Sequence, residues 1–202
     1  MDRATKLILI IGYNGTGKTT ITKKLVVSEL KKATSHILVV TPDDIEWNML
    51  PEVHHKFIER VKTYKKARKI IYNEKIEYLD PQNRALQKGN TVDLIADYFR
   101  DGLVIFDDCR SYFNAALESS LHNLLIRRRQ KMIDIIMVAH GFTEIPPKAF
   151  TFASDIILFK TMDNIDKRKP YLKDFEKMKA MQQYVNTEAE KNPHFNIVIP
   201  QI

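Results

Sequence analysis

Residues 7–20 read Leu7-Ile8-Leu9-Ile10-Ile11-Gly12-Tyr13-Asn14-Gly15-Thr16-Gly17-Lys18-Thr19-Thr20, an aliphatic run that leads into a glycine-rich loop. The loop matches the phosphate-binding P-loop pattern G-x-x-x-x-G-K-T at every required position. The aliphatic run predicts a buried parallel strand, and the residues from Thr19 onward predict a helix. A strand that passes through this loop into a helix is the context that the motif requires. The stretch therefore predicts an α/β sheet with a phosphate-binding site at the end of one strand.

Each part of the loop has an expected task. The glycines permit left-handed backbone angles, so successive N–H groups can surround an anion, and the helix dipole adds positive potential. Lys18 is expected to reach the β- and γ-phosphates of ATP, and the Thr19 hydroxyl to coordinate Mg²⁺. The expected nucleotide-binding residues are Gly12, Tyr13, Asn14, Gly15, Thr16, Gly17, Lys18, Thr19 and Thr20. The alternative is a glycine-rich turn that binds nothing.

Length and composition predict one domain spanning residues 1–202. The chain has 44% hydrophobic and 28% charged residues, which is ordinary for a globular protein. No stretch approaches the roughly 18 apolar residues of a membrane span, so an integral membrane protein is not expected. The single cysteine, Cys109, excludes an intrachain disulfide and fits a reducing compartment.

Positive charge is in excess, with 32 Lys and Arg against 25 Asp and Glu, for a net charge of +7. Much of it is clustered, in residues 56–69, 127–131 and 167–169. Such clusters favour a polyanionic partner, here a nucleic acid, although solvated helix faces are the alternative. Residues 48–90 contain the first cluster and are expected to form a basic insertion beside the core sheet.

A second decisive stretch is 103–108, where the aliphatic run Leu-Val-Ile-Phe ends in Asp107 and Asp108. This matches the Walker B pattern, in which the first carboxylate serves Mg²⁺ at the carboxyl end of a strand. Alone the pattern is weak, because many strands end in an acidic turn. The P-loop strengthens it, since a nucleotide's metal needs a carboxylate nearby. We therefore assign Asp107 to the metal and Asp108 to orienting or deprotonating the attacking water.

Further elements follow from the periodicity. Strands are expected at 36–40, 68–72, 134–139, 155–160 and 196–199, and helices at 19–32, 51–66, 91–100, 111–132 and 171–191. His140 follows the strand at 134–139, where it is either a sensor of the γ-phosphate or a cap of the next loop. Asp43 and Glu46 follow the strand at 36–40 and could serve chemistry, but capping of a helix by Asp43 or Asp44 is the stronger interpretation.

With these residues in place, the chain resembles the HerA/FtsK superfamily of P-loop ATPases, and within it the viral genome-packaging and zonular occludens toxin-like phage assembly ATPases. The resemblance implies a three-layer, RecA/ASCE-like α/β fold with a central, mostly parallel sheet. It also implies a ring, hexameric or pentameric, in which an arginine of one subunit completes the neighbour's site. By position the candidates are Arg127, Arg128 and Arg129. Asp108 and His140 stand where the family usually has Glu and Gln.

The function expected from motifs and resemblance together is Mg²⁺-dependent ATP hydrolysis that drives DNA translocation during viral genome packaging. Viral capsid or membrane-vertex proteins are further expected partners, and the expected location is the cytoplasm or the virion. One alternative is a small-molecule or polynucleotide kinase in which Asp43 or Asp44 is the base. The other is a nucleotide-binding, DNA-anchoring module without turnover.

Overall fold

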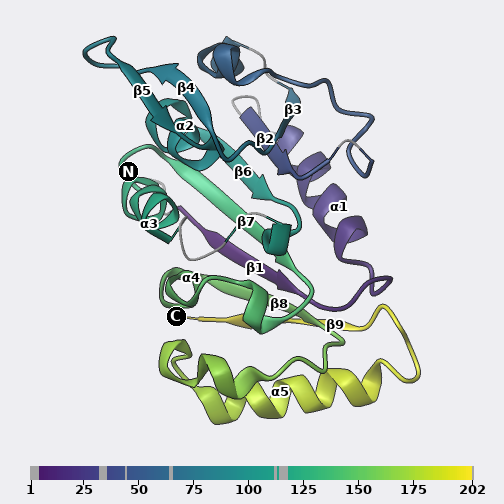
Figure 1. Cartoon of the computed structure of the whole chain (residues 1–202). Coiled ribbons are helices and arrows are strands. Elements are labelled where there is room, and N and C mark those ends of the chain that lie inside the picture. The colour runs from purple at the N-terminus through teal and green to yellow at the C-terminus, as the bar shows by residue number, and fades with distance from the viewer. Residues whose placement is uncertain are drawn as a thin grey trace.

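The computed structural model describes residues 5–31, 36–43, 45–63, 66–111, 113 and 118–201. Seven strands form one sheet in the order β3-β2-β6-β7-β1-β8-β9 (Figure 1). All neighbours are parallel except β8 and β9, which are antiparallel. The strands are β1 (Leu7–Ile11), β2 (His36–Thr41), β3 (Ala67–Ile71), β6 (Gly102–Phe106), β7 (Ile133–Ala139), β8 (Asp155–Phe159) and β9 (Asn196–Pro200).

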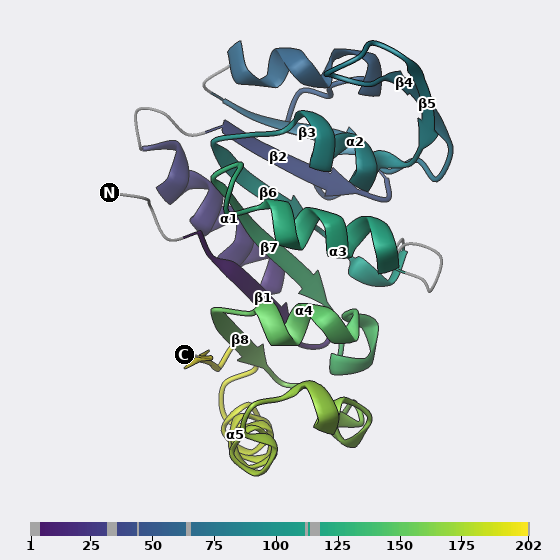
Figure 2. The same ribbon diagram turned by 90° about the vertical axis from the view of Figure 1, so that its left-hand side faces the viewer.

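Helices cover both faces of this sheet. Helix α1 (Lys18–Leu30) lies on one face, and α2 (Thr91–Tyr98), α3 (Glu118–Arg127) and α4 (Pro147–Phe152) lie on the other (Figure 2). The alternation along β1 explains both layers, because Leu7, Leu9 and Ile11 pack toward α2–α4 while Ile10 packs toward α1. The predicted three-layer α/β fold with a mostly parallel central sheet is confirmed.

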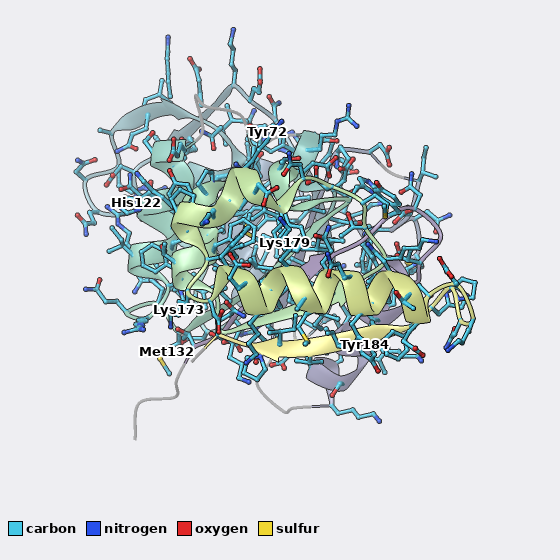
Figure 3. The ribbon with its side chains drawn as sticks, turned by 90° about the horizontal axis from the view of Figure 1, so that it is seen from below. Tyr72, His122, Met132, Lys173, Lys179 and Tyr184 are labelled. Carbon is cyan, nitrogen blue, oxygen red and sulfur yellow. The ribbon has the colours of Figure 1, made fainter. Side chains whose placement is uncertain are left out.

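Helix α5 (Phe175–Glu188) closes the edge of the molecule that β9 occupies. Figure 3 looks onto this edge and shows α5 and β9 side by side, with Tyr184 in the last part of the helix. Short 3₁₀ helices complete the connections: η1 (His55–Thr63), η2 (Cys109–Ser111), η4 (Phe142–Glu144) and η5 (Ile165–Tyr171). Among the described residues, no helix is both long and apolar enough to cross a membrane.

Residues 48–90 were expected to form an insertion beside the core sheet, but part of this segment belongs to the sheet. Strand β3 forms the edge of the sheet, and Val53 N donates to Lys69 O at 2.8 Å, so 51–53 run extended along β3. The helix predicted from Pro51 is therefore a 3₁₀ helix that begins only at His55. The hairpin of β4 (Ile76–Leu79) and β5 (Leu86–Gly89), which the periodicity did not predict, does lie outside the main sheet.

The long helix predicted for 111–132 is wrong at both ends. Within the described residues the helical part is α3, which begins at Glu118, and Cys109–Ser111 form the 3₁₀ helix η2. At the other end, residues 128–132 form a turn that leads into β7, and Met132 has a φ of +55°, which an α-helix does not allow. Residues 114–117 of the prediction lie outside the described residues.

Candidate nucleotide site

The P-loop links β1 to α1 and is anchored to both strands that flank β1. Gly12 N donates to Ala139 O of β7 at 3.1 Å, and Tyr13 N donates to Lys160 O, just after β8, at 2.9 Å. A Cβ on Gly12 would lie 2.4 Å from Phe159 Cβ, and Gly17 has a φ of +103°. These two glycines are therefore required by close packing and by a left-handed backbone.

A cavity of about 450 Å³ opens at this loop, at the carboxyl ends of β1, β2, β6 and β7. Six of the predicted nucleotide-binding residues are in its wall: Asn14, Gly15, Gly17, Lys18, Thr19 and Thr20. The side chains of the acidic turn after β2, of Asp107 and Asp108 after β6, and of His140 after β7 complete the wall. Gly12, Tyr13 and Thr16 shape the loop, and the Thr16 hydroxyl donates to Tyr13 O at 2.7 Å.

Lys18 is held at the centre of this cavity. Its side chain is only 7% exposed, and Nζ donates to Tyr13 O at 2.8 Å and lies 3.3 Å from His140 Nδ1. Burial lowers the pKa of Lys18, against the opposing effect of Asp107, Glu144 and other carboxylates. A bound polyphosphate would favour the charged ammonium, so the site is suited to an anionic ligand.

Asp107 is buried at the end of β6, and it has a partner that the sequence did not reveal. The indole Nε1 of Trp47 donates to Asp107 Oδ2 at 2.6 Å. Trp47 is itself 1% exposed and is the only tryptophan of the chain. Burial raises the pKa of Asp107, although the Trp47 hydrogen bond works in the opposite direction. One carboxylate oxygen is thereby fixed, which constrains where the other can point.

The residues around Asp107 fit a magnesium ion. The Thr19 hydroxyl donates to Glu46 Oε2 at 3.1 Å, and Thr19, Glu46 and Asp107 line the same cavity. Hard oxygen donors of this kind are what Mg²⁺ prefers. Glu46 and Asp108 also help to raise the pKa of Asp107, which shows a local excess of negative charge. A divalent cation would offset that excess.

Asp108 has an uncommon backbone conformation, and its side chain is fixed at one carboxylate oxygen. Its φ is +53°, a left-handed conformation uncommon outside glycine, and the Ser111 hydroxyl donates to its Oδ2 at 2.7 Å. The other oxygen, Oδ1, is buried, makes no hydrogen bond with any described residue and lies 3.8 Å from His140 Nε2. This leaves one carboxylate oxygen available to a ligand or a water molecule.

Glu144 is a second residue that sequence reasoning missed. Its Oε2 accepts from the His140 backbone N at 2.7 Å, and Arg110 Nη1 lies 3.9 Å from its Oε1. Ligand atoms of Asp108, His140 and Glu144 lie within 4.8 Å of one another. The predicted cap is reversed, because Glu144 caps the backbone N–H of His140, whereas the ring of His140 faces Lys18 and Asp108.

The three candidate arginines do not come near this cavity. Arg127–Arg129 precede β7 and lie at the amino ends of the strands, whereas the cavity is at the carboxyl ends (Figure 1). Arg128 is 3% exposed and donates to Thr5 O and Phe152 O, both at 3.2 Å. Its predicted action on a neighbouring subunit therefore does not fit, because the guanidinium is inside its own chain. Arg127 pairs with Asp97 at 2.9 Å, and Arg129 is exposed.

The acidic turn after β2 differs from the capping interpretation but lies where the chemical interpretation requires. Asp43 Oδ1 accepts from Ile45 N at 3.0 Å, so it caps a turn, because the described residues 45–50 form turns and no helix. Asp44 lies outside the described residues. Asp43 and Glu46 both line the cavity.

No protein-family model and no curated protein matches this sequence. Solved structures do match over nearly the whole chain. The genome packaging NTPase B204 of Sulfolobus turreted icosahedral virus 2 with AMPPCP is 13% identical, with a TM-score of 0.65 and 98% of each chain covered. At this level of identity, the two proteins are shown to share a fold. The DNA-packaging ATPase B204 of Sulfolobus turreted icosahedral virus is 16% identical, with a TM-score of 0.60 and 98% of each chain covered. The resemblance to viral packaging ATPases is therefore confirmed at the level of the fold.

Proposed function

We propose that this protein is a Mg²⁺-dependent ATPase that drives DNA translocation in viral genome packaging. The observation that carries the proposal is the convergence of Lys18, Asp107, Asp108 and His140 on one cavity at the P-loop. Three separate strands supply these groups, which is what a P-loop ATPase needs and a glycine turn does not. The B204 proteins with the same fold were crystallised with ATP-gammaS, AMP and AMPPCP, which supports a nucleotide ligand.

The roles follow from the geometry. The loop N–H groups and Lys18 would hold the β- and γ-phosphates and offset negative charge on the transferred group. Thr19, Asp107 and Glu46 would hold Mg²⁺, which supplies further charge stabilisation when bound. Asp108 would accept a hydrogen bond from the attacking water through its free Oδ1. His140 lies between Lys18 Nζ and Asp108, so it would contact the γ-phosphate and report its loss.

DNA as partner is supported by the net charge of +7 and by the names of the B204 proteins. A ring of five or six copies is part of the same proposal, because the described residues place no arginine of the chain's own in the cavity wall. Capsid or membrane-vertex proteins at the packaging site, and a cytoplasmic or virion-associated location, complete the proposal.

The test is an ATPase assay with and without DNA on the full chain and on Asp108→Asn. We expect a loss of about 100-fold or more in kcat for the variant, as for removal of a water-orienting group. Asp101→Asn is the matched control, since Asp101 has a similar φ of +55° but lies outside the cavity wall. Hydrolysis that survives intact in Asp108→Asn would remove the assigned acid.

The same assay separates the proposal from its alternatives. Free phosphate released from γ-labelled ATP supports a hydrolase, whereas label on an acceptor hydroxyl would identify a kinase. Binding without any turnover, even with DNA present, would identify a nucleotide-binding anchor. Sedimentation with an ATP analogue and DNA measures the size of the ring, and a chain that stays monomeric under those conditions would contradict the motor.

A further inference from the structure

The loop between α5 and β9 brings a residue to the P-loop that no sequence pattern assigned to it. We propose that the imidazole ring of His194 forms the nucleobase side of the site, by stacking against the base of the bound nucleotide. The proposal rests on the nucleotide-binding part of the proposed function. It adds a specificity determinant that lies outside the Walker motifs.

His194 lies directly against the loop. A Cβ placed on Gly17 would be 3.3 Å from His194 Nδ1 and 3.6 Å from Phe159 Cε1, and His194 is in the wall of the same cavity as Lys18. Figure 1 shows the loop before β9 next to the loop between β1 and α1. Because Gly17 has no side chain, the His194 ring can lie directly against the P-loop backbone.

The cavity has two ends of different chemistry. Lys18, Asp108 and His140 mark the end that suits a γ-phosphate, because the ammonium and the free carboxylate oxygen are there. Strand β1 separates β7, which carries His140, from β8 and β9, next to which His194 lies. A nucleoside triphosphate with its γ-phosphate at Lys18 would thus direct its nucleoside away from β7. His194 is a wall residue of the cavity on that side, next to Phe159 of β8.

The loop is held so that the ring position is defined. His194 N donates to Asn192 Oδ1 at 3.1 Å, and Asn196 Nδ2 donates to His194 O at 3.1 Å. Next in the chain, Phe195 packs edge-on against Tyr184 of α5 with ring centroids 5.7 Å apart. The backbone of His194 is therefore fixed on both sides, whereas its ring makes no hydrogen bond with any residue that the structure describes. A fixed backbone and an uncommitted planar ring suit stacking, which needs a face and no donor.

A contact with a phosphate is the competing role for the same ring, because a protonated imidazole could meet the α-phosphate. The two roles make different demands. Stacking requires a planar ring and a nucleobase, whereas a phosphate contact requires a charge and no base. Phenylalanine keeps the ring and removes the charge, and tripolyphosphate keeps the charge and removes the base. These two substitutions, one in the protein and one in the ligand, distinguish the roles.

The experiment measures Kd for ATP and for tripolyphosphate, both with Mg²⁺, on the full chain, His194→Ala and His194→Phe. We expect His194→Ala to bind ATP roughly ten-fold more weakly, as for the loss of one base stack. Tripolyphosphate affinity should stay unchanged in both variants, and His194→Phe should bind ATP within about three-fold of the unaltered chain. His54→Ala is the matched control, because His54 is exposed and lies outside the cavity wall.

Two results would overturn the inference while leaving the nucleotide site intact. One is unchanged ATP affinity in His194→Ala. The other is an equal loss of ATP and tripolyphosphate affinity in both variants, which would assign the ring to a phosphate. If the unaltered chain bound neither ligand, the proposed function itself would fail. Since His194 is exposed, the variants are expected to fold, and circular dichroism checks this.

Discussion

The hydrogen bond from Trp47 to Asp107 yields the sharpest prediction, because it connects the carboxylate that we propose for the metal to the stability of the whole domain. Trp47→Phe removes the donor from a 2.6 Å bond to a buried carboxylate. A hydrogen bond to a charged group contributes about 1.5–3 kcal/mol, and the smaller ring forfeits roughly 1 kcal/mol more of packing. We expect a loss of about 3 kcal/mol in the free energy of unfolding at neutral pH. That is a large fraction of the roughly 5–15 kcal/mol of a typical domain.

The loss should depend on pH, and its sign follows from the proton balance. The Trp47 hydrogen bond favours the charged carboxylate, so its removal raises the folded-state pKa of Asp107 further. The native protein then binds more protons than the unfolded chain, and stability falls as pH rises from about 4, the ordinary pKa of Asp, through the raised folded value. The deficit of Trp47→Phe should therefore be larger at about pH 7.5 than at about pH 4.

Urea denaturation followed by circular dichroism measures these quantities for Trp47→Phe, Asp107→Asn and the double variant. The amide oxygen of Asn still accepts a hydrogen bond, so the double variant isolates the contribution of the charge. We expect Trp47→Phe to cost about 1 kcal/mol less when Asp107 is already Asn. Equal costs in both backgrounds, together with equal costs at the two pH values, would refute the reasoning and leave a packing role alone for Trp47.

Other predictions concern groups that the structure places on either side of the cavity. Asp107→Asn should raise the unfolding midpoint of the ligand-free protein at neutral pH, since it removes a buried charge, and should abolish Mg²⁺-dependent ATPase activity; a lower midpoint would contradict the raised pKa. Arg128→Ala should cost about 2–4 kcal/mol in urea denaturation, because buried carbonyls lose their donor, whereas Arg129→Ala should stay within about 0.5 kcal/mol. If Arg128→Ala lost ATPase activity while its stability stayed unchanged, Arg128 would have a catalytic role and not a structural one. Arg168 donates to three backbone carbonyls of residues 142–145. Arg168→Ala should therefore lower kcat about ten-fold with less effect on KM, and should speed amide hydrogen exchange in residues 142–145. Unchanged exchange would show that Arg168 does not hold this loop.

The strands and the core of the site were predictable because their signals are local. The aliphatic runs at 7–11, 102–106 and 133–139 are parallel strands buried at all positions except Ile8 and Asp134, and such strands need apolar residues on both faces. Their carboxyl ends meet at one edge of the sheet, so the polar residues that follow them converge. Lys18, Asp107, Asp108 and His140 were found in this way.

The missed residues carry no local signal. Trp47 contacts Asp107 across 60 positions of sequence, and Glu144 reaches the site because the loop after β7 folds back over it. His194 comes from the last loop of the chain. Each follows a turn whose direction depends on packing, and periodicity does not report that direction.

Of the three candidate arginines, only Arg128 is excluded from acting on a neighbouring subunit, because it is buried in its own chain; Arg127 and Arg129 remain predictions. A basic cluster directly before a parallel strand lies at its amino end, opposite the edge where an open α/β sheet places its site. Action on a neighbouring subunit requires an exposed guanidinium, which Arg129 has and Arg128 does not. Arg128 instead donates to Thr5 O, just before β1, and to Phe152 O at the end of α4.

The charge balance of the cavity leads to one more prediction. Asp107 and Asp108 line the cavity, Glu144 accepts from the backbone of His140 next to it, and burial lowers the pKa of Lys18. Arg110 is already close to Glu144 at 3.9 Å. A bound triphosphate adds further negative charge, which Mg²⁺ and Lys18 only partly offset, so a cation from another copy would stabilise the transition state most. The isolated chain should then bind ATP far better than it hydrolyses it, and kcat per chain should rise with protein concentration. A rate per chain that stays constant from dilute to concentrated protein, with DNA present, would show that each chain carries a complete site.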